Sequence, residues 1–307
     1  MLPSPPLLTR IAYRIKHRGI LNFVAAASRN LWIRISPTRA RAFGFIEAVV
    51  RTREGFEIGG ASRAFDGQGL LPVYPIARRM DNCNFGAATI WEGTLKEGEH
   101  FVSTQGRPLG YQYIREATDL NGIADARYDF VCSAYMIQHC ANPIKALMEW
   151  VRVLKPGGLL VVLIPHWQKT FDHKRPVTTR AHLIDDHRKN TGEDDQTHIP
   201  EVLALHDLGR DILAGTAAQF RERTLNNPVN RAVHQHVFDP RLAVELMDYL
   251  GLQVCHLELQ PVDNIIVVAR KLPAGSQPDN AGLLAGANSL AFGQSLVPAN
   301  GPGAAAS

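Results

Sequence analysis

Short apolar runs alternate with helical patterns along the chain from residue 55 onward. Five runs have the length and composition of buried strands: Gly55–Ile58, Leu71–Tyr74, Tyr111–Arg115, Tyr128–Ser133 and Leu159–Ile164. Between the last two runs, apolar residues recur at helical spacing over Pro143–Leu154, and Lys155-Pro156-Gly157-Gly158 then ends the helix. Units of strand, helix, turn and strand predict an α/β fold with a parallel sheet and crossover helices.

The second half of the chain departs from this rhythm twice. Residues 165–237 form a polar insertion, after which a helix is expected over Pro240–Leu250. Two further strands, Gln253–Leu259 and Asn264–Ala269, can pair as a hairpin at the edge of the sheet. Residues 272–307 lack periodicity and are dominated by Ala, Gly, Pro, Ser and Asn, so we predict a disordered tail there. The main domain is therefore expected to span residues 42–271.

Residues 1–41 form a basic helical extension in this interpretation. Apolar residues recur at helical spacing over residues 7–35, with arginines between them and a break near Gly19. The extension either packs on the domain or lies on a membrane surface, as basic amphipathic helices can. Its charges followed by a short apolar run also resemble a secretion signal. We nevertheless expect a cytoplasmic protein, in peripheral contact with the inner face of a membrane if the second alternative holds.

Composition narrows the function classes. The chain has 307 residues, 45% of them hydrophobic, which is enough for a sizeable core. Its net charge of +4 is concentrated at the N-terminus, where residues 1–46 hold eight Lys or Arg and no acid. The slightly acidic remainder argues against a nucleic-acid groove. The four cysteines form no CxxC pair, so neither a zinc ribbon nor a disulfide framework is indicated.

The loop after the first expected strand is rich in small residues. Glu57-Ile58-Gly59-Gly60-Ala61-Ser62 lets the backbone approach a ligand closely, but it lacks the glycine spacing of a dinucleotide fingerprint. Open parallel sheets bind ligands beyond the carboxyl ends of their strands, where three acids are expected: Glu57, Asp81 and Asp119. A carboxylate after the second strand can accept both hydrogens of a ribose diol. Alternatively, each acid caps a turn. With Gly59, Gly60 and Ser133, these acids form the predicted cofactor-binding set.

An ordered series of motifs resembles the class I methyltransferases that use S-adenosylmethionine. It consists of Glu57-x-Gly59, the Asp81 region, Tyr128-Asp129-Phe130-Val131, His139-x3-Pro143 and Leu154-Lys155-Pro156-Gly157-Gly158. Longer phrases are similar to an uncharacterised bacterial group associated with glycosyltransferases and polysaccharide synthesis. They include Asp81-Asn82-Cys83-Asn84-Phe85, Ile90-Trp91-Glu92-Gly93, Thr170-Phe171-Asp172-His173 and Arg175-Pro176-Val177-Thr178-Thr179. The resemblance covers about residues 55–271 and implies a Rossmann-like sheet and S-adenosylmethionine as the cofactor.

The chain departs from that group in two places. Where similar proteins tend to read Ser-His-x-Leu-Glu-His, it has Ser133-Ala134-Tyr135-Met136-Ile137-Gln138-His139. His234-Gln235-His236 looks like a triple-histidine motif with its centre replaced. Roles that the group assigns to the missing histidine and glutamate do not transfer to this chain.

Eight of the twelve histidines lie between residues 166 and 236, interleaved with acids. Three interpretations remain open: a histidine general base, a divalent-cation site, or a structural network of hydrogen bonds. His166, directly after the fifth strand, and His173 are the predicted catalytic residues. His139 is a weaker candidate. We assign no metal ligands, because the His234-x-His236 spacing is common by chance.

The resemblance implies methyl transfer to an oxygen of a sugar, glycan or polysaccharide precursor. Methylation of a lipid, quinone or other small metabolite is an alternative, and so is a methyltransferase-like binding or scaffold module without activity. The expected partner is a small-molecule or glycan substrate, without nucleic acid.

Overall fold

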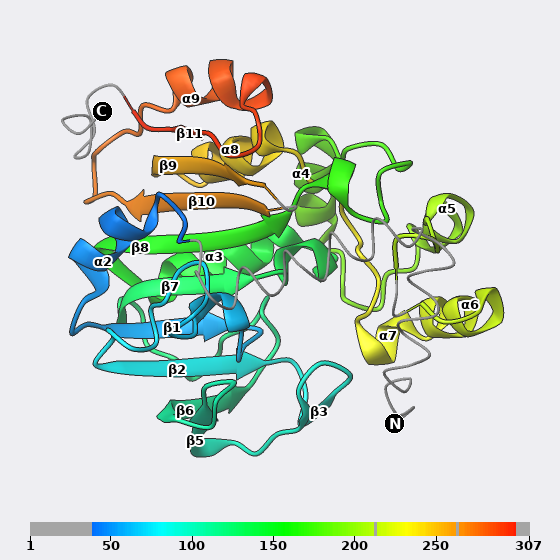
Figure 1. The fold of residues 1–307 in the computed structure, drawn as a ribbon, viewed down its shortest axis with the longest axis horizontal. Coiled ribbons are helices and arrows are strands. Elements are labelled where there is room, and N and C mark those ends of the chain that lie inside the picture. The colour runs from blue at the N-terminus through cyan, green and yellow to red at the C-terminus, as the bar shows by residue number, and fades with distance from the viewer. Residues whose placement is uncertain (1–38, 212–213, 262–263, 299–307) are drawn as a thin grey trace.

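A nine-stranded sheet organises the molecule (Figure 1). The computed structural model describes residues 39–211, 214–261 and 264–298. The strand order is β11 (Ser295–Leu296), β9 (Leu252–Gln260), β10 (Asn264–Lys271), β8 (Leu154–Pro165), β7 (Tyr128–Ala134), β1 (Glu54–Ile58), β2 (Arg79–Asn84), β6 (Pro108–Ile114) and β5 (Gly98–Val102). A separate small hairpin joins β3 (Ala88–Thr89) and β4 (Gly93–Thr94).

The middle of the sheet is parallel and its ends are antiparallel. Strands β6, β2, β1, β7 and β8 run in one direction, as strands joined by crossover segments must. Strand β10 lies between β8 and β9 and is antiparallel to both. The hairpin expected from the sequence therefore forms, and the α/β, Rossmann-like fold class is confirmed.

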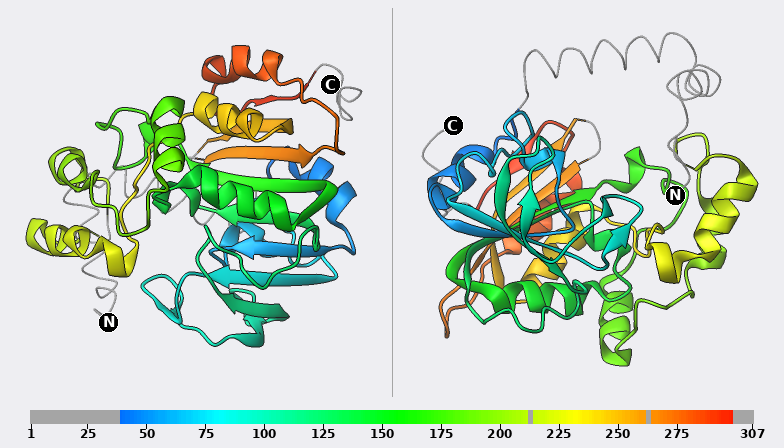
Figure 2. Two further views of the ribbon diagram at one scale, coloured as in Figure 1. Left: turned by 180° about the vertical axis from the view of Figure 1, so that it is seen from behind. Right: turned by 90° about the horizontal axis from the view of Figure 1, so that it is seen from below.

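Helices cover both faces of the sheet, which is why its central strands are apolar on both sides. Leu160, Val162 and Ile164 of β8 pack on one face with α3 (Pro143–Val153) and α8 (Pro240–Tyr249). The alternate residues of β8 pack on the other face with α2 (Phe43–Val50) and the loop that follows β1 (Figure 2). Helices α3 and α8 each begin with a capping Asn or Asp followed by proline, which explains their start points.

The second strand differs from the sequence prediction. Residues Leu71–Tyr74 lie in a loop, and the strand is Arg79–Asn84. The apolar run wrongly predicts a strand because Leu71, Val73 and Tyr74 are buried for another reason. They pack against the sheet face that α2 covers, without pairing as a strand. Consequently Asp81 lies within a strand instead of after one.

The expectation of a disordered tail from residue 272 is wrong for residues 272–298. This segment forms α9 (Ala281–Gly286), a 3-10 turn over Ala287–Ser289 and β11, which pairs with β9. Leu283 and Ala287 are buried in the core beside α8. The helix is too short to show periodicity, and its packing depends on a surface that forms only in the folded sheet. The remaining residues, 299–307, lie outside the described part of the chain.

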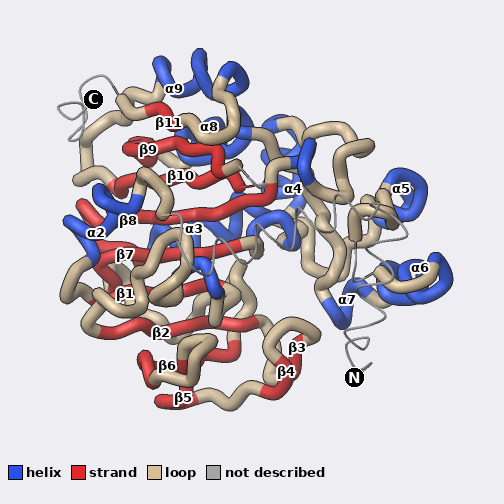
Figure 3. Tube along the Cα trace, viewed as in Figure 1, coloured by secondary structure: helices blue, strands red, loops and turns tan. Residues whose placement is uncertain are grey.

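The insertion, residues 165–237, stands beside the carboxyl ends of the parallel strands (Figure 3). It contains α4 (Arg180–Lys189), α5 (Ile199–Leu205), α6 (Ala217–Leu225) and α7 (Asn227–Asn230). Backbone hydrogen bonds join its two ends, from Trp167 to Phe238 and from Thr178 to Val237.

The predicted N-terminal extension, residues 1–41, falls almost entirely outside the described residues. At its end, the backbone N–H groups of Arg41 and Ala42 donate to the buried Glu258 carboxylate of β9, at 3.0 and 2.9 Å. Within the described ranges, no helix is both long and apolar enough to cross a membrane.

Candidate functional site

A cavity of about 540 Å³ opens at the carboxyl ends of the parallel strands. This size is within the range of small-molecule sites, and the position is the one where open α/β sheets bind ligands. One wall comes from the strand ends: Gly59, Asn84, Glu116, Tyr135 and Pro165. The insertion supplies the opposite wall with Thr170, Phe171, Glu193, Arg231 and His234. The cavity therefore lies between the carboxyl edge of the sheet and the insertion.

Two adjacent glycines shape the loop after β1. Gly59 has a φ of +85°, and a Cβ there would lie 2.9 Å from Cγ of Met136. A Cβ on Gly60 would overlap the Glu57 carboxylate. Both positions therefore require glycine, and the bare backbone at Gly59 is open to a ligand.

Glu57 is buried beneath this loop. Its Oε2 accepts a 2.5 Å hydrogen bond from the Tyr74 hydroxyl, while Oε1 has no hydrogen-bond partner among the described residues. Burial raises the pKa of Glu57 to about 7, although hydrogen bonds from Ser62 and Tyr74 oppose the shift. An orphaned acceptor at this position is suited to a donor group on a ligand or on an ordered water.

Asp81 does not line the cavity, contrary to its expected place at a strand end. Its carboxylate accepts from the Tyr128 hydroxyl at 2.9 Å and from the Tyr111 N–H at 2.8 Å, and it pairs with Arg79 at 2.7 Å. These contacts connect β2, β6 and β7 inside the sheet. The residue that ends β2 and lines the cavity is Asn84.

Asp119 and Ser133 also have local structural partners. Asp119 is exposed and accepts from the N–H of Asn121 at 3.1 Å, which is the turn-capping alternative. The hydroxyl of buried Ser133 donates to the Ile58 carbonyl at 2.9 Å. Of the predicted cofactor set, Gly59 lines the cavity, and Glu57, Gly60 and Ser133 are sequence neighbours of lining residues.

The two predicted catalytic histidines lie away from the cavity lining. The His166 ring packs 4.9 Å from that of Phe292, and its Nδ1 accepts from the Gln168 N–H at 3.3 Å. Nε2 of His173 forms a 2.8 Å hydrogen bond with Asp207. The catalytic roles predicted for both residues stay untested, and their positions favour other histidines.

His234 lines the cavity and is oriented by a buried acid. Its Nδ1 lies 2.5 Å from Oδ2 of Asp172, and the other oxygen of Asp172 pairs with Arg175 at 2.9 Å. Burial raises the pKa of Asp172, but His234 and Arg175 outweigh this effect and lower the pKa to about 2. An ionised carboxylate on Nδ1 fixes the tautomer and leaves Nε2 as a hydrogen-bond acceptor.

His139 lies beside His234, with 4.7 Å between the two ring centroids. Its Nδ1 contacts the Val233 carbonyl at 2.9 Å, so Nδ1 carries the proton and Nε2 is free to accept. Burial, with a smaller effect from His234, lowers the pKa of His139 to about 3. His139 therefore offers an unprotonated Nε2 near neutral pH beside the ring of His234.

Acidic and basic side chains complete the insertion side of the cavity. Arg231 pairs with Glu116 at 3.0 Å and with Glu193 at 3.4 Å, joining the insertion to the segment after β6. Burial raises the pKa of Glu193 to about 7, against the opposing effects of the Ala141 N–H and Arg231. Trp91, 51% exposed, stands at the cavity with its ring 5.7 Å from that of His139.

Part of this chain is similar to proteins of known families. Residues 72–162, from the loop before β2 into β8, match the family described as a methyltransferase domain. A demethylmenaquinone methyltransferase of Bacteroides fragilis is 30% identical over 95 residues, which are 31% of this chain. The chain spans 39% of that relative's length.

Two solved structures show more distant similarity. A candidate methyltransferase from Bacillus halodurans has 13% identity and a TM-score of 0.43, and the alignment covers 75% of this chain and 97% of the other. An S-adenosylmethionine-dependent methyltransferase from Aquifex aeolicus has 11% identity and a TM-score of 0.39, covering 78% and 97%. Similarity of this extent carries no information on the substrate. Residues 72–162 of this chain are therefore similar to a methyltransferase domain, as the sequence predicts.

Proposed function

We propose that this methyltransferase domain transfers the methyl group of S-adenosylmethionine to a hydroxyl oxygen of a sugar, glycan or polysaccharide precursor. Bound S-adenosylmethionine would supply a sulfonium methyl group that an acceptor oxygen attacks in line, with the C–S bond breaking and S-adenosylhomocysteine leaving. The chain's own contribution is to align the acceptor and to accept its proton. The His234–Asp172 pair on the insertion side of the cavity is the observation that carries this proposal.

The sheet side of the cavity fits the donor. The glycine-dependent loop after β1 leaves open backbone at Gly59, and the orphaned Oε1 of Glu57 lies beneath it. Asn84 and Glu116 offer polar groups at the ends of the next two strands. We propose that Gly59, Asn84 and Glu116 hold the donor, and that Glu57, Gly60 and Ser133 support the loop.

The insertion side fits an acceptor hydroxyl. Nε2 of His234 would take the hydroxyl proton as the oxygen attacks, and the Asp172 carboxylate on Nδ1 would stabilise the resulting imidazolium. Neutral His139 beside it can accept a second hydrogen bond and so orient the acceptor. Exposed Trp91 and the Phe171 ring provide apolar faces on which a sugar ring can stack.

A lipid, quinone or other small metabolite is the second candidate acceptor. The aromatic residues of the cavity suit a flat apolar ring as well as a sugar, and the Bacteroides fragilis relative is a quinone-precursor methyltransferase by name. A hydroxyl on either acceptor would need the same base.

A mass increment of one methyl group on an acceptor incubated with the chain and S-adenosylmethionine tests the proposal directly. Soluble glycans, nucleotide sugars and hydroquinones are compared in parallel, so that methylation of hydroquinones alone would favour the second candidate. Calorimetry with S-adenosylmethionine tests the donor site separately. Absence of donor binding to folded protein would favour the scaffold alternative.

The histidine assignment is tested by turnover. We expect His234→Ala to lower kcat by a factor on the order of 100 to 10,000 while donor affinity stays unchanged, because the base acts on the acceptor. His173→Ala serves as the matched control from the same insertion. A larger loss in His173→Ala or His166→Ala would instead support the residues predicted from the sequence.

We also propose that the protein acts in the cytoplasm, with the basic residues 1–41 in peripheral contact with a membrane. Liposome flotation of the full chain and of a variant lacking the first 38 residues tests this. Flotation of the full chain alone supports the contact. Equal behaviour of both proteins excludes it.

A further inference from the structure

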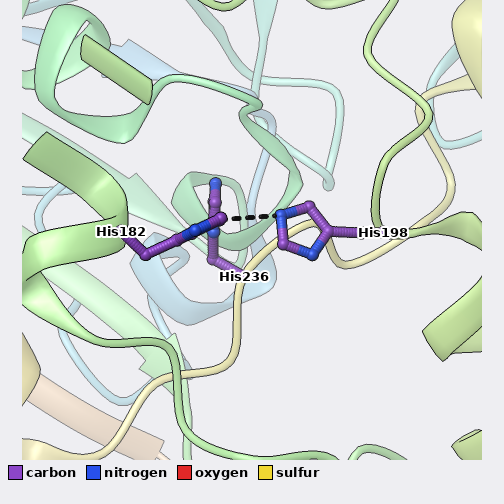
Figure 4. A group of neighbouring side chains, drawn as sticks. All are labelled: His182, His198 and His236. Atoms are coloured by element: carbon purple, nitrogen blue, oxygen red, sulfur yellow. Dashed lines mark hydrogen bonds between the residues drawn. The ribbon is translucent and has the colours of Figure 1, made fainter. Parts of the chain in front are cut away.

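Three histidines from separate parts of the insertion meet in one cluster (Figure 4). They are His182 in the first turn of α4, His198 at the start of α5, and His236 in the chain leading to α8. Each can offer one ring nitrogen, and these atoms lie within 4.8 Å of one another. Asp186 adds a carboxylate one turn after His182.

Two of the distances are close to those of a tetrahedral metal site. Nε2 of His182 lies 3.1 Å from Nε2 of His198 and 3.3 Å from Oδ2 of Asp186. Ligand atoms at about 2.0 to 2.1 Å from a common zinc ion are roughly 3.4 Å apart in tetrahedral geometry. Nε2 of His236 lies 3.7 Å from Oδ2 of Asp186, but it also lies 3.2 Å from the Ala141 carbonyl. Nδ1 of His236, which has no hydrogen-bond partner among the described residues, is therefore the nitrogen left to bind an ion.

Two buried polar atoms of this cluster have no hydrogen-bond partner among the described residues. They are Oδ2 of Asp186 and Nδ1 of His236. The other carboxylate oxygen of Asp186 accepts from the Thr191 hydroxyl at 3.2 Å, which directs Oδ2 towards the histidines. Buried polar atoms normally have a partner, and an ion bound among the histidines would supply one to both atoms.

We propose that His182, His198, His236 and Asp186 bind one structural Zn²⁺ ion. Three imidazoles and one carboxylate are a donor set that zinc accepts, whereas Mg²⁺ and Ca²⁺ require oxygen ligands. His182, whose side chain is 40% exposed, gives an ion access from solvent. The sequence leaves a divalent-cation site open but assigns no ligands, because these three histidines lie far apart in the chain and only the fold brings them together.

The ion would join the insertion to the domain. Its ligands come from three segments of the insertion, and Nε2 of His236 lies 3.2 Å from the Ala141 carbonyl at the start of α3. The N–H of His236 donates to the carbonyl of Gln138, a residue that lines the cavity. Zinc would therefore stabilise the wall of the cavity without lying inside the cavity. This inference does not depend on methyl transfer.

Metal content tests the proposal on the full chain. After dialysis against a chelator, the protein is titrated with Zn²⁺ in competition with a chromophoric chelator, and with Co²⁺ followed by visible absorption. We expect one Zn²⁺ per chain, a four-coordinate Co²⁺ spectrum, and a higher melting temperature with zinc. Replacing one ligand, in His182→Gln, should weaken Zn²⁺ binding by roughly 10-fold to 100-fold or more.

His187→Gln is the control, because His187 lies on the same helix outside the cluster. Circular dichroism verifies that each variant is folded. Should His182→Gln fail to fold, Asp186→Asn provides the same comparison. Binding that is absent in the unchanged chain, equal in the ligand and control variants, or selective for Mn²⁺ over Zn²⁺ would overturn the proposal.

Discussion

At the scale of single residues, the buried Glu57 carboxyl makes stability depend on pH. Burial raises its pKa from the ordinary 4.5 to about 7, so the folded chain binds a proton that the unfolded chain has released. Its contribution to stability is complete below pH 4.5 and is lost as the pH rises through 7. The change is at most about 3 kcal/mol.

Glu57→Gln should remove this dependence, because the amide can still accept from Tyr74 and does not ionise. We expect the free energy of unfolding of the original chain, relative to Glu57→Gln, to fall between pH 5 and pH 8. Urea denaturation of both proteins at each pH measures it. A constant difference would show that Glu57 ionises normally.

The glycine pair after β1 gives a second prediction. Gly60→Ala should destabilise the fold by on the order of 2 kcal/mol, since the added Cβ overlaps the Glu57 carboxylate. Gly44→Ala, in α2, is the control, because its Cβ meets nothing within 4 Å and alanine favours a helix. Thermal melting should lower the transition of the first variant and slightly raise that of the second. The reverse order would mean that the loop relaxes freely.

The loop after β1 is easier to predict from the sequence than the histidine that lines the cavity. The small residues around Gly59 are contiguous, so their spacing alone indicates a close backbone approach. The proposed base, His234, cannot be identified in this way, because it is oriented by Asp172, which lies 62 residues earlier in the chain. Among eight clustered histidines, only the folded insertion shows which ones reach the cavity.

At the scale of secondary-structure elements, one arginine holds the end of the insertion. Arg175 is 2% exposed and pairs with Asp172 and Glu201, and it also donates to the carbonyls of His234 and Gln235. Arg175→Ala would leave the Asp172 charge buried and release the segment that carries His234. We expect a loss of about 3 to 5 kcal/mol in the free energy of unfolding.

An exposed ion pair provides the comparison. Arg241→Ala removes the contact with Glu245 on the surface of α8, where the arginine is 55% exposed, and should cost below about 0.5 kcal/mol. Chemical denaturation of both variants measures the two losses. Similar losses would mean that the Arg175 network contributes only as a surface pair does.

The pattern of apolar residues does not predict strands β2 and β5. Strands β7 and β10 are apolar runs that begin at the predicted residues, whereas β8 begins at Leu154, five residues before its predicted start. Strand β2 is polar, but Asn82 and Asn84 are buried because their amides bond to each other and to Gln112 of β6. A network of this kind satisfies polar groups inside a sheet and has no signature in hydrophobic periodicity.

At the scale of the whole molecule, the C-terminal segment is part of the core. Leu283→Ala should lower the free energy of unfolding by about 2 to 3 kcal/mol, because Leu283 is 3% exposed against α8. Val297→Ala, at a position 43% exposed, should change it by less than about 0.5 kcal/mol. Calorimetric melting decides between this packing and the disordered tail expected from the sequence, for which both variants would melt alike.

The hydrogen bonds from Trp167 to Phe238 and from Thr178 to Val237 bring the two ends of the insertion together. A segment that leaves and returns at one point can change in length at little entropic cost to the domain that carries it. Under the proposed function, selection would change the insertion that contacts the acceptor while the sheet edge that holds the donor stays constant. Chains with this arrangement are expected to diversify in substrate chiefly through residues 165–237.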